Sequence, residues 1–536
     1  MDETLAAVLS YLPPPTFSTA NSHPSSPSAA DAAAVFSLDE EDRISRLPDA
    51  LLRRVVSRLP TKDAARTAAI SSRWRRVWAS IPLHLDDGGL APGDVTAALA
   101  AHPGPVASAR LASAHLATVD PDVVASWFAS LAAKEVGELA VVNGSWPIEW
   151  RPPPDLLGCA SLRRLWLGLC QFPDTAGLPP AFANLQEIVV VHSSMQDREL
   201  HAVLPRCPEL ESLALVLTQD YPRYVHIWSG SLRCVVLWMS MVREVHLDDA
   251  PNMERLLLEP IAGASTHVKI INAPRLKVLG YFDVGLHQLK IGSTVIKDGI
   301  KVKPSAMVRT LRTLALKVQF GVEEQVKLVP LLLRCFPCLE TLYIMSVPSE
   351  TPVNVGVEFW DLVGYTECVH SHLRKFVFQA ARGKDSELAF VKFVMGRAQM
   401  LEQMLIFVDD GSSRVVVLSH LSSEGCVSAD ATVVVESHDK SYPWNFHRAS
   451  NMLQSDPFAC SSCCRSCCGC GSFSINPCWV LARWIGAFCI AGHSSMMFMH
   501  CFCVPCLLIF HRRLPSQELN VARQNSERLR PARVRP

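Results

Sequence analysis

A short apolar pattern, Leu-x-x-Leu-x-Leu with apolar replacements, recurs along the middle of the chain and constrains its fold more than any other feature. The last two apolar positions of each copy are two residues apart, the spacing of side chains on one face of a β-strand. A single strand of this kind cannot bury its apolar face alone, so the copies have to stack. The copies begin at Leu162, Leu185, Leu210, Leu232, Met253, Leu311 and Leu339, and looser copies begin at Leu373 and Leu401.

A second marker sets the period. The pattern Pro-x-(Leu/Met)-(Glu/Lys)-x-Leu begins at Pro208, Pro251 and Pro274, and a matching hexapeptide begins at Pro337. From one marker to the next the intervals are 43, 23 and 63 residues. They correspond to two, one and three units of about 21 to 23 residues, within the range of roughly 20 to 29 that is typical of leucine-rich repeats.

Some elements are expected beside the main strands. Two further apolar triplets begin at Val242 and Leu286, and we interpret them as returning strands on the outer side of a curved sheet. Before the repeats, the Ala-rich stretch 86–150 is weakly patterned, but 120–133 predicts a helix and 138–142 predicts an apolar strand.

The chain begins with two contrasting segments. Residues 1–38 are rich in Ser, Pro and Ala, and we predict a disordered leader there. Residues 39–85 predict three short helices, with Pro48 in the first turn of one helix and Ser72 as the cap of the third. So small a unit needs fewer large apolar residues than it has, and the surplus indicates a docking face.

These three helices resemble an F-box. The match keeps both Leu-Pro pairs, at 47–48 and 59–60, together with Asp63 and an Arg-Trp-Arg-x-x-Trp ending at 73–78. Ile70 stands where such sequences commonly have Leu.

The rest of the chain resembles the plant F-box proteins that carry leucine-rich repeats and an FBD region. The FBD-like part is marked by short motifs at 373–376, 400–404 and 456–458. The resemblance implies an α+β fold, a small three-helix F-box followed by a leucine-rich-repeat solenoid, in which a curved sheet has helices and loops outside. The domains that follow are 1–38 (leader), 39–85 (F-box), 86–367 (leucine-rich repeats), 368–458 (FBD-like C-terminal repeat region) and 459–536 (an atypical Cys-rich, apolar tail).

The resemblance also implies a function without catalysis in this chain. The F-box would dock on a Skp-type adaptor and through it on a cullin, while the repeats bind an unidentified target protein. The chain would then be the substrate-recognition subunit of an SCF-type (Skp–cullin–F-box) ubiquitin ligase, in which another enzyme transfers ubiquitin and proximity accelerates the transfer. The resemblance carries over a set of adaptor-binding residues, and each of them either contacts the adaptor or holds the three helices together. These residues are Leu47, Pro48, Leu51, Leu52, Val55, Leu59, Trp74 and Trp78.

Strand alternation predicts which repeat residues point away from the core. Tryptophan, tyrosine and arginine are enriched at the centre of protein interfaces, so such residues are candidates for target recognition. The alternative for each of them is an ordinary surface side chain. The candidate substrate-binding residues are Arg164, Trp166, Trp238, His246, Arg255, Tyr343 and Lys375.

Composition argues against several other classes of protein. Lys plus Arg (51) balances Asp plus Glu (51), so no global charge favours nucleic acid. We find no glycine-rich phosphate loop, no zinc-protease or serine-hydrolase motif, and no ligand spacing among the histidines, and we expect no cofactor and no metal. Cys335 and Cys338 have redox spacing, but they fall at a repeat junction. Few cysteines precede residue 460, which favours a cytoplasmic or nuclear location.

The tail has a different character. Eleven of the 19 cysteines lie between Cys460 and Cys506, where zinc binding, acylation or no function are alternatives. Residues 484–510 contain no Asp, Glu, Lys or Arg and are long enough to span a bilayer. The alternative function is therefore a membrane-tethered leucine-rich-repeat scaffold without a ligase role. An alternative exon or an imperfect gene model would also explain the tail.

Overall fold

The structure is a computed structural model of the chain. It describes residues 2–13, 44, 46–59, 61–112, 115–144, 149–175, 182–218, 221–259, 261, 263–349, 356–409, 411–421, 425–437 and 444–459. The chain divides into two compact units, Met1–Cys470 and Gly471–Pro536, and all described residues lie in the first. The apolar segment 484–510 and the cysteines from Cys460 onward lie outside the described residues. Among the described helices, none has the length and hydrophobicity needed to cross a membrane.

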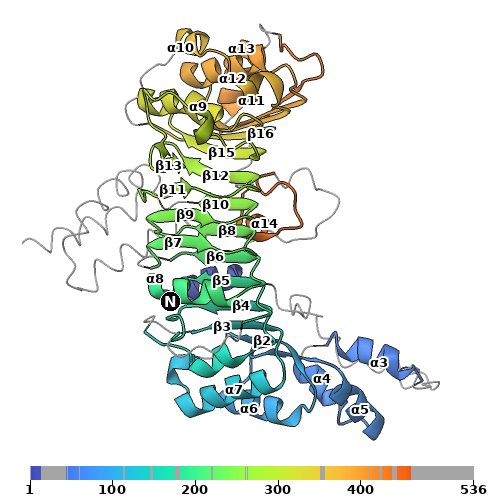
Figure 1. Cartoon of the computed structure of the whole chain (residues 1–536). Helices are drawn as coiled ribbons and strands as arrows, with labels where there is room; N and C mark the ends of the chain where they lie inside the picture. Colours follow the sequence, from blue (N-terminus) through green and yellow to red (C-terminus); the bar gives the residue numbers. More distant parts are fainter. Residues whose placement is uncertain are drawn as a thin grey trace, which may run out of the picture. The chain divides into compact units, whose positions relative to one another are not determined.

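Among the residues that the structure describes, fourteen strands form the main sheet, and they follow one another in a ladder (Figure 1). Each strand pairs in parallel with the next. In ladder order the strands are β1 (Leu83–Asp86), β2 (Val106–Leu111), β3 (Glu138–Val142), β4 (Arg164–Gly168), β5 (Glu187–Val191), β6 (Ser212–Val216), β8 (Cys234–Trp238), β10 (Arg255–Glu259), β12 (Val278–Asp283), β15 (Thr313–Val318), β16 (Thr341–Ser346), β17 (Lys375–Ala381), β18 (Gln403–Val408) and β19 (Thr432–Ser437).

The apolar side chains of the repeated pattern lie opposite one another in neighbouring strands. Leu165 on β4 is opposite Ile188 on β5, which is opposite Leu213 on β6. These side chains are fully buried in one core that continues along the ladder. Every predicted copy of the pattern overlaps a strand, and the observed combination of helices with a large sheet agrees with the predicted α+β class.

A second sheet runs beside part of the first. Its strands, in sheet order, are β14 (Thr294–Val295), β13 (Gln288–Ile291), β11 (His267–Ile270), β9 (Glu244–Asp249) and β7 (Tyr224–Trp228). They pair in parallel except for β13 with β14. The last two apolar residues of each extra triplet lie in β9 and β13, which confirms that these triplets form strands outside the main sheet.

Helices lie between the strands and at both ends of the ladder. They are α1 (Asp2–Ser10), α3 (Asp49–Val56), α4 (Thr61–Thr67), α5 (Ser72–Ser80), α6 (Pro92–Ala101), α7 (Pro121–Ala133), α8 (Asp197–Val203), α9 (Glu323–Cys335), α10 (Val357–Leu362), α11 (Glu367–Ser371), α12 (Asp385–Arg397), α13 (Gly411–Leu421) and α14 (Phe446–Ser450), with short 3-10 turns at 116–118, 154–158, 204–206 and 304–306. The predicted helix over 120–133 is α7, and the predicted strand over 138–142 is β3. The sequence did not predict β1 and β2, because their apolar residues are interrupted by small and polar ones.

Helices α3, α4 and α5 have a small core of their own. It consists of Leu52, Val56, Ala64, Trp74, Val77 and Ile81. The N-terminal cap of α5 is Ser71 rather than the predicted Ser72, because it is the Ser71 hydroxyl that accepts from the Trp74 amide, at 3.4 Å. Trp78 packs against both this core and the core of the main sheet.

Part of the predicted disordered leader is structured. Residues 2–10 form α1, and Ala7, Val8 and Leu12 are buried. The composition of 1–38 as a whole hides this short apolar run. Gly168 on β4 leaves room for it, because a Cβ at that position would lie 3.0 Å from Val8 Cγ1.

Candidate protein-interaction site

Helix α3 presents an apolar stripe on its exposed face. Leu51 and Val55 are four residues apart, which places them on one side of the helix, and Pro48 precedes Leu51 by three residues. Pro48 is the N-cap residue of α3 rather than part of its first turn as predicted. Leu51 is 46% exposed and Val55 is 43% exposed, and Ile44, just before the helix, is 57% exposed. We call Pro48, Leu51 and Val55 the α3 stripe. Large apolar side chains grouped in this way are typical of a surface that a partner covers.

The other predicted adaptor residues have different positions. Leu52 and Trp74 are buried in the small core, and Leu47, Leu59 and Trp78 are partly buried against it. The structure therefore divides the predicted set into an exposed stripe and residues that hold the three helices together.

Polar contacts fix the start of α3 against α5. The Arg73 guanidinium donates to Asp49 Oδ1 at 2.8 Å and to the Leu47 carbonyl at 2.5 Å. Because Asp49 is the first residue of α3 and Leu47 lies just before it, Arg73 orients the end of the helix that carries Pro48.

A histidine joins these helices to the sheet region. His102 is fully buried, its ring lies edge-on to Trp78, and its Nε2 is 3.3 Å from the Trp78 carbonyl. Burial lowers the pKa of the His102 imidazole, which remains neutral at neutral pH. The contact ties the C-terminal end of α5 to the loop that precedes β2.

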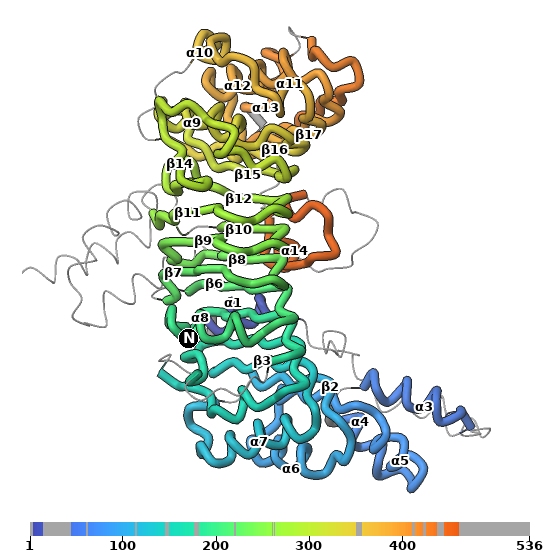
Figure 2. Tube along the Cα trace, in the orientation of Figure 1, coloured from blue at the N-terminus to red at the C-terminus, as the bar shows by residue number. Residues whose placement is uncertain are grey.

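A second candidate surface is the face of the main sheet opposite its core. We call it the covered face and define it by Trp238, Arg255, Tyr281, Tyr343 and Lys375, which lie on β8, β10, β12, β16 and β17. Residues 444–459, which include α14, lie against these strands (Figures 1 and 2).

Three aromatic side chains of segment 444–459 are buried in this contact. The Trp444 ring centroid lies 5.1 Å from that of Trp238 and 5.6 Å from that of Tyr281. Phe458 packs against Tyr281 and Tyr343 at centroid distances of 5.0 and 5.5 Å. Phe446 packs against Trp238. Ring geometries of this kind are favourable beyond the area that they bury.

Polar contacts surround the aromatic cluster. Asp456 Oδ2 accepts a hydrogen bond from the Tyr343 hydroxyl at 2.7 Å and from Lys375 Nζ at 2.9 Å. Trp444 Nε1 donates to Glu259 Oε2 at 2.9 Å. Burial, together with the nearby Asp456 carboxylate, raises the pKa of the Tyr343 hydroxyl, so Tyr343 stays protonated and donates.

Helix α1 and the residues just after it also contact segment 444–459. The Tyr11 and Phe446 ring centroids are 5.4 Å apart, and His447 Nε2 lies 2.6 Å from the Ser10 carbonyl. Burial raises the pKa of the Tyr11 hydroxyl to about 12. The first and last described segments of the chain are therefore in contact.

The predicted substrate-binding residues do not form one exposed surface. Trp238, Arg255 and Tyr343 are buried and Lys375 is partly buried, all in contact with segment 444–459. Trp166 is also buried, whereas Arg164 is exposed and forms ion pairs with Glu138 and Glu187. His246 lies on β9 of the second sheet. The prediction that all seven are surface residues is wrong, because alternation gives the side of a strand but not what packs there.

A group of possible metal ligands lies in the second sheet, where we expected none. His226 on β7 is paired with His246 on β9, and both approach Asp248. This is the group of three metal-ligand residues that the described part of the chain brings together. The two histidines are 20 residues apart, close to one repeat, and only the pairing of β7 with β9 shows that they meet.

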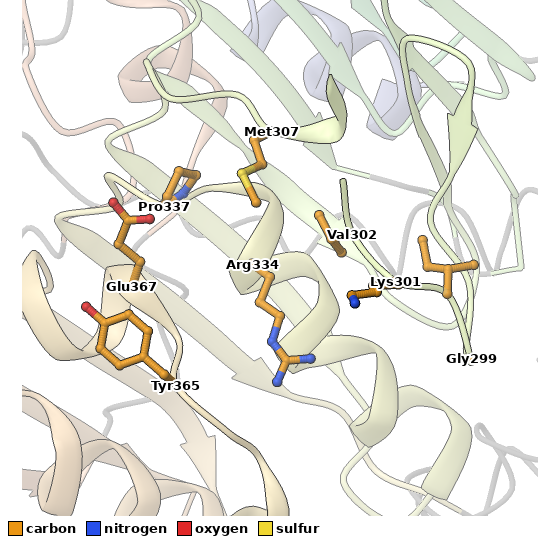
Figure 3. Close-up of a pocket in the computed structure, with 9 residues that line it drawn as sticks. Gly299, Lys301, Val302, Met307, Arg334, Pro337, Tyr365 and Glu367 are labelled. Carbon is orange, nitrogen blue, oxygen red and sulfur yellow. The ribbon is translucent and has the colours of Figure 1, made fainter. Parts of the chain in front are cut away.

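An open pocket of about 450 Å³ lies beside the C-terminal end of α9 (Figure 3). Lys301 and Arg334 line it together with Tyr365 and Glu367, and the Glu367 carboxylate is 3.8 Å from an Arg309 guanidinium nitrogen. No predicted site residue lines this pocket.

The described region holds eight cysteines, all of them free. Cys335 is buried, whereas Cys338, at redox spacing from it, is partly buried. Burial raises the pKa of the Cys335 thiol to about 12, so it is not a reactive thiolate at neutral pH. This accords with a repeat junction rather than a redox site.

Comparison with known protein families identifies three regions. The F-box domain family matches residues 44–86, the leucine-rich repeats of the FBD-associated F-box protein At5g56370 family match 124–344, and the FBD family matches 364–406.

Several Arabidopsis thaliana proteins are similar over most of their length. F-box/LRR-repeat protein 13 is 24% identical over 457 residues, which cover 74% of this chain and 97% of the relative. F-box/FBD/LRR-repeat protein At1g13570 is 23% identical, with 69% and 91% covered. FBD-associated F-box protein At3g52670 is 28% identical, with 68% and 88% covered.

Proposed function

We propose that this chain, a plant-type F-box protein with leucine-rich repeats and an FBD region, is the substrate-recognition subunit of an SCF-type ubiquitin ligase. Its F-box, repeat and FBD regions and its Arabidopsis relatives support the assignment. F-box proteins generally act as substrate adaptors in such complexes. The finer proposal is that α3–α5 bind a Skp-type adaptor, and through it a cullin, while the solenoid of repeats binds a target protein.

The observation that carries this proposal is the α3 stripe. Pro48, Leu51 and Val55 are exposed, whereas Leu52 and Val56 of the same helix are fully buried. A helix that is apolar on both sides needs two partners, and this chain supplies one of them. The partner best suited to the open side is a surface of apolar helices, which we propose is the Skp-type adaptor.

The proposed role requires no catalytic group in this chain. Holding a target near the ubiquitin-transferring enzyme raises the effective concentration of the reacting groups. We propose a cytoplasmic or nuclear location, because the eight described cysteines are free and the buried ones serve as apolar core residues.

The experiment that tests this proposal replaces Leu51 and Val55 by Asp in the full chain and measures binding to a purified Skp-type adaptor by calorimetry. We expect affinity to fall at least about 100-fold, because two carboxylates would be desolvated in an apolar interface. The matched control is Leu418→Asp on α13, since Leu418 is 44% exposed, close to the value for Leu51. Equal affinity of the double variant and this control would contradict the proposal.

A further inference from the structure

As a bound peptide ligand would, segment 444–459 binds the covered face through side-chain contacts and does not extend the sheet. Strands β8, β10, β12, β15 and β16 pair with one another in the ladder, and segment 444–459 contributes no strand to either described sheet. Its own regular structure is the five-residue helix α14. The backbone hydrogen bonds of the sheet therefore do not depend on the segment, which is held by side-chain contacts.

One set of contacts recognises the segment as a peptide backbone. The Arg255 guanidinium donates to the carbonyl oxygens of Asn451 at 3.1 Å, Met452 at 3.4 Å and Gln454 at 2.5 Å. Arg255 is only 6% exposed. A buried guanidinium that binds three carbonyl oxygens within four residues of chain can accept many peptide sequences, because every peptide has backbone carbonyl oxygens.

Another set of contacts is specific for side chains. Trp444 and Phe458 fill the aromatic cluster of Trp238, Tyr281 and Tyr343. The Asp456 carboxylate, two residues before Phe458, binds Tyr343 and Lys375. Aromatic anchors in a desolvated pocket, flanked by a charge-assisted hydrogen bond, are the usual composition of an interaction hot spot.

We propose that the covered face is a peptide-binding surface, that segment 444–459 is its intramolecular ligand, and that target proteins compete with it through a segment of the same chemistry. Such a target segment carries two aromatic anchors and a carboxylate two residues before the second. This inference rests on the proposed function, and it assigns the class of target that the repeats recognise.

The experiment uses the full chain with Trp444→Ala and Phe458→Ala, which removes both anchors of the intramolecular ligand. The probe is a fluorescein-labelled peptide with the sequence of residues 444–459, and its binding is followed by fluorescence anisotropy. In the wild-type chain the attached segment competes at an effective concentration on the order of millimolar. We therefore expect the double variant to bind the probe at least about 100-fold more tightly than wild type.

Matched controls accompany this measurement. Leu453→Ala changes a side chain that is 96% exposed and should leave probe affinity at the wild-type value. A probe with Asn in place of Asp456 and Ala in place of Phe458 should bind weakly to every variant. Hydrogen exchange of the amides in β16 reports whether the sheet stays folded in the double variant.

The outcomes decide the proposal in both directions. Tight probe binding with a protected sheet supports it. No probe binding with a protected sheet overturns it, and so does loss of sheet protection, because the segment would then be part of the folding core. Adaptor binding through the α3 stripe is measured on the same variants. A failure of the proposed ligase function can therefore be distinguished from a failure of the peptide-binding proposal.

A different observation carries a second inference, which is independent of the ligase role. His226 Nδ1 lies 3.6 Å from Asp248 Oδ2, and His246 Nδ1 lies 3.9 Å from the same oxygen. The three ligand atoms are all within 4.8 Å of one another. Zinc bonds of about 2.0 to 2.2 Å in tetrahedral geometry separate neighbouring ligand atoms by roughly 3.3 Å, so small side-chain shifts would suffice.

The surroundings orient the ligands. His246 Nε2 lies 3.1 Å from Glu244 Oε2, an arrangement that directs Nδ1 towards Asp248 and is typical of the outer shell of metal sites. Lys269 Nζ lies 3.8 Å from Asp248 Oδ1, the oxygen that does not face the histidines. The His201 ring packs edge-on against His226. We infer that His226, His246 and Asp248 form a site for a zinc-type divalent cation, with a fourth position open to water or a partner.

The test is a Co²⁺ titration of the full chain, followed by visible absorption. Thiols are first blocked by alkylation so that the cysteines between 460 and 506 do not contribute. We expect His246→Ala and Asp248→Asn each to bind one equivalent less Co²⁺ than wild type. His267→Ala, an exposed histidine on the neighbouring strand β11, should bind the wild-type amount. Equal stoichiometry and equal spectra in all four proteins would overturn the site.

Discussion

The α3 stripe and the covered face of the main sheet both carry more large apolar side chains than their local core needs. The two surfaces differ in whether another part of the chain covers them. Leu51 and Val55 remain exposed. Trp238 and Tyr343 are buried beneath Trp444, Phe446 and Phe458. A surplus of apolar side chains therefore identifies a contact surface, but it does not tell whether the partner is another molecule or a distant segment of the same chain.

The largest predicted effect on stability distinguishes two adjacent leucines of α3, one buried and one exposed. Leu52→Ala should lower the opening free energy of α3–α5 by about 2 to 5 kcal/mol, because a fully buried side chain in a small core is truncated. Leu51→Ala should change it by no more than about 0.5 kcal/mol. Hydrogen exchange of the amides in 49–80 in the full chain measures both. Similar losses for the two variants would show that Leu51 belongs to the core.

Acidification should lower the stability of the repeat region more than that of helix α3. His287 is buried, its Nδ1 accepts from the Thr266 amide at 3.1 Å, and burial lowers its pKa to about 4. Between pH 6.5 and 4 the unfolded state is protonated at this residue while the folded state is not, so stability falls as pH falls. At pH 5 the loss from His287 is about 2 kcal/mol.

The measurement is urea unfolding at pH 7 and pH 5. His287→Asn keeps an acceptor but cannot take up the proton, so its stability should depend less on pH than that of the wild type. Residues 47–81 contain no histidine, but the buried His102 contacts Trp78 of α5 and burial lowers its pKa too. The comparison is therefore made with α3, whose hydrogen exchange should respond less to acid than that of the second sheet. A His287→Asn protein with the wild-type pH dependence would contradict this prediction.

The smallest predicted effect concerns a single hydroxyl on the covered face. Tyr343→Phe removes the hydrogen bond to Asp456, which keeps its contact with Lys375. Opening of residues 444–458 should become easier by about 1 to 2 kcal/mol, measured by hydrogen exchange, with the sheet unchanged. Tyr365→Phe is the control, because that hydroxyl bonds an exposed Ser371. Equal effects in the two variants would argue against a specific role of Asp456.

The repeat strands could be predicted because their signal is local and periodic. Leu165, Ile188 and Leu213 stand at the same position of successive units, and the parallel ladder places them opposite one another. The apolar positions of α3 were predictable for the same reason. Strands β1 and β2 lack this periodicity, and their place in the sheet follows from tertiary pairing, of β2 with β3 and of β1 with β2.

The sequence by itself determined the period and the strand positions, because each of these depends on residues within one turn or one repeat of each other. It also indicated an F-box, through the resemblance of residues 47–78 to that family. Only the tertiary structure decided that Asp456 meets Tyr343 and that His226 meets His246. Asp456 and Tyr343 are 113 residues apart in the chain. No local spacing encodes such a contact, because it depends on how all the intervening repeats stack and on where the chain returns across them.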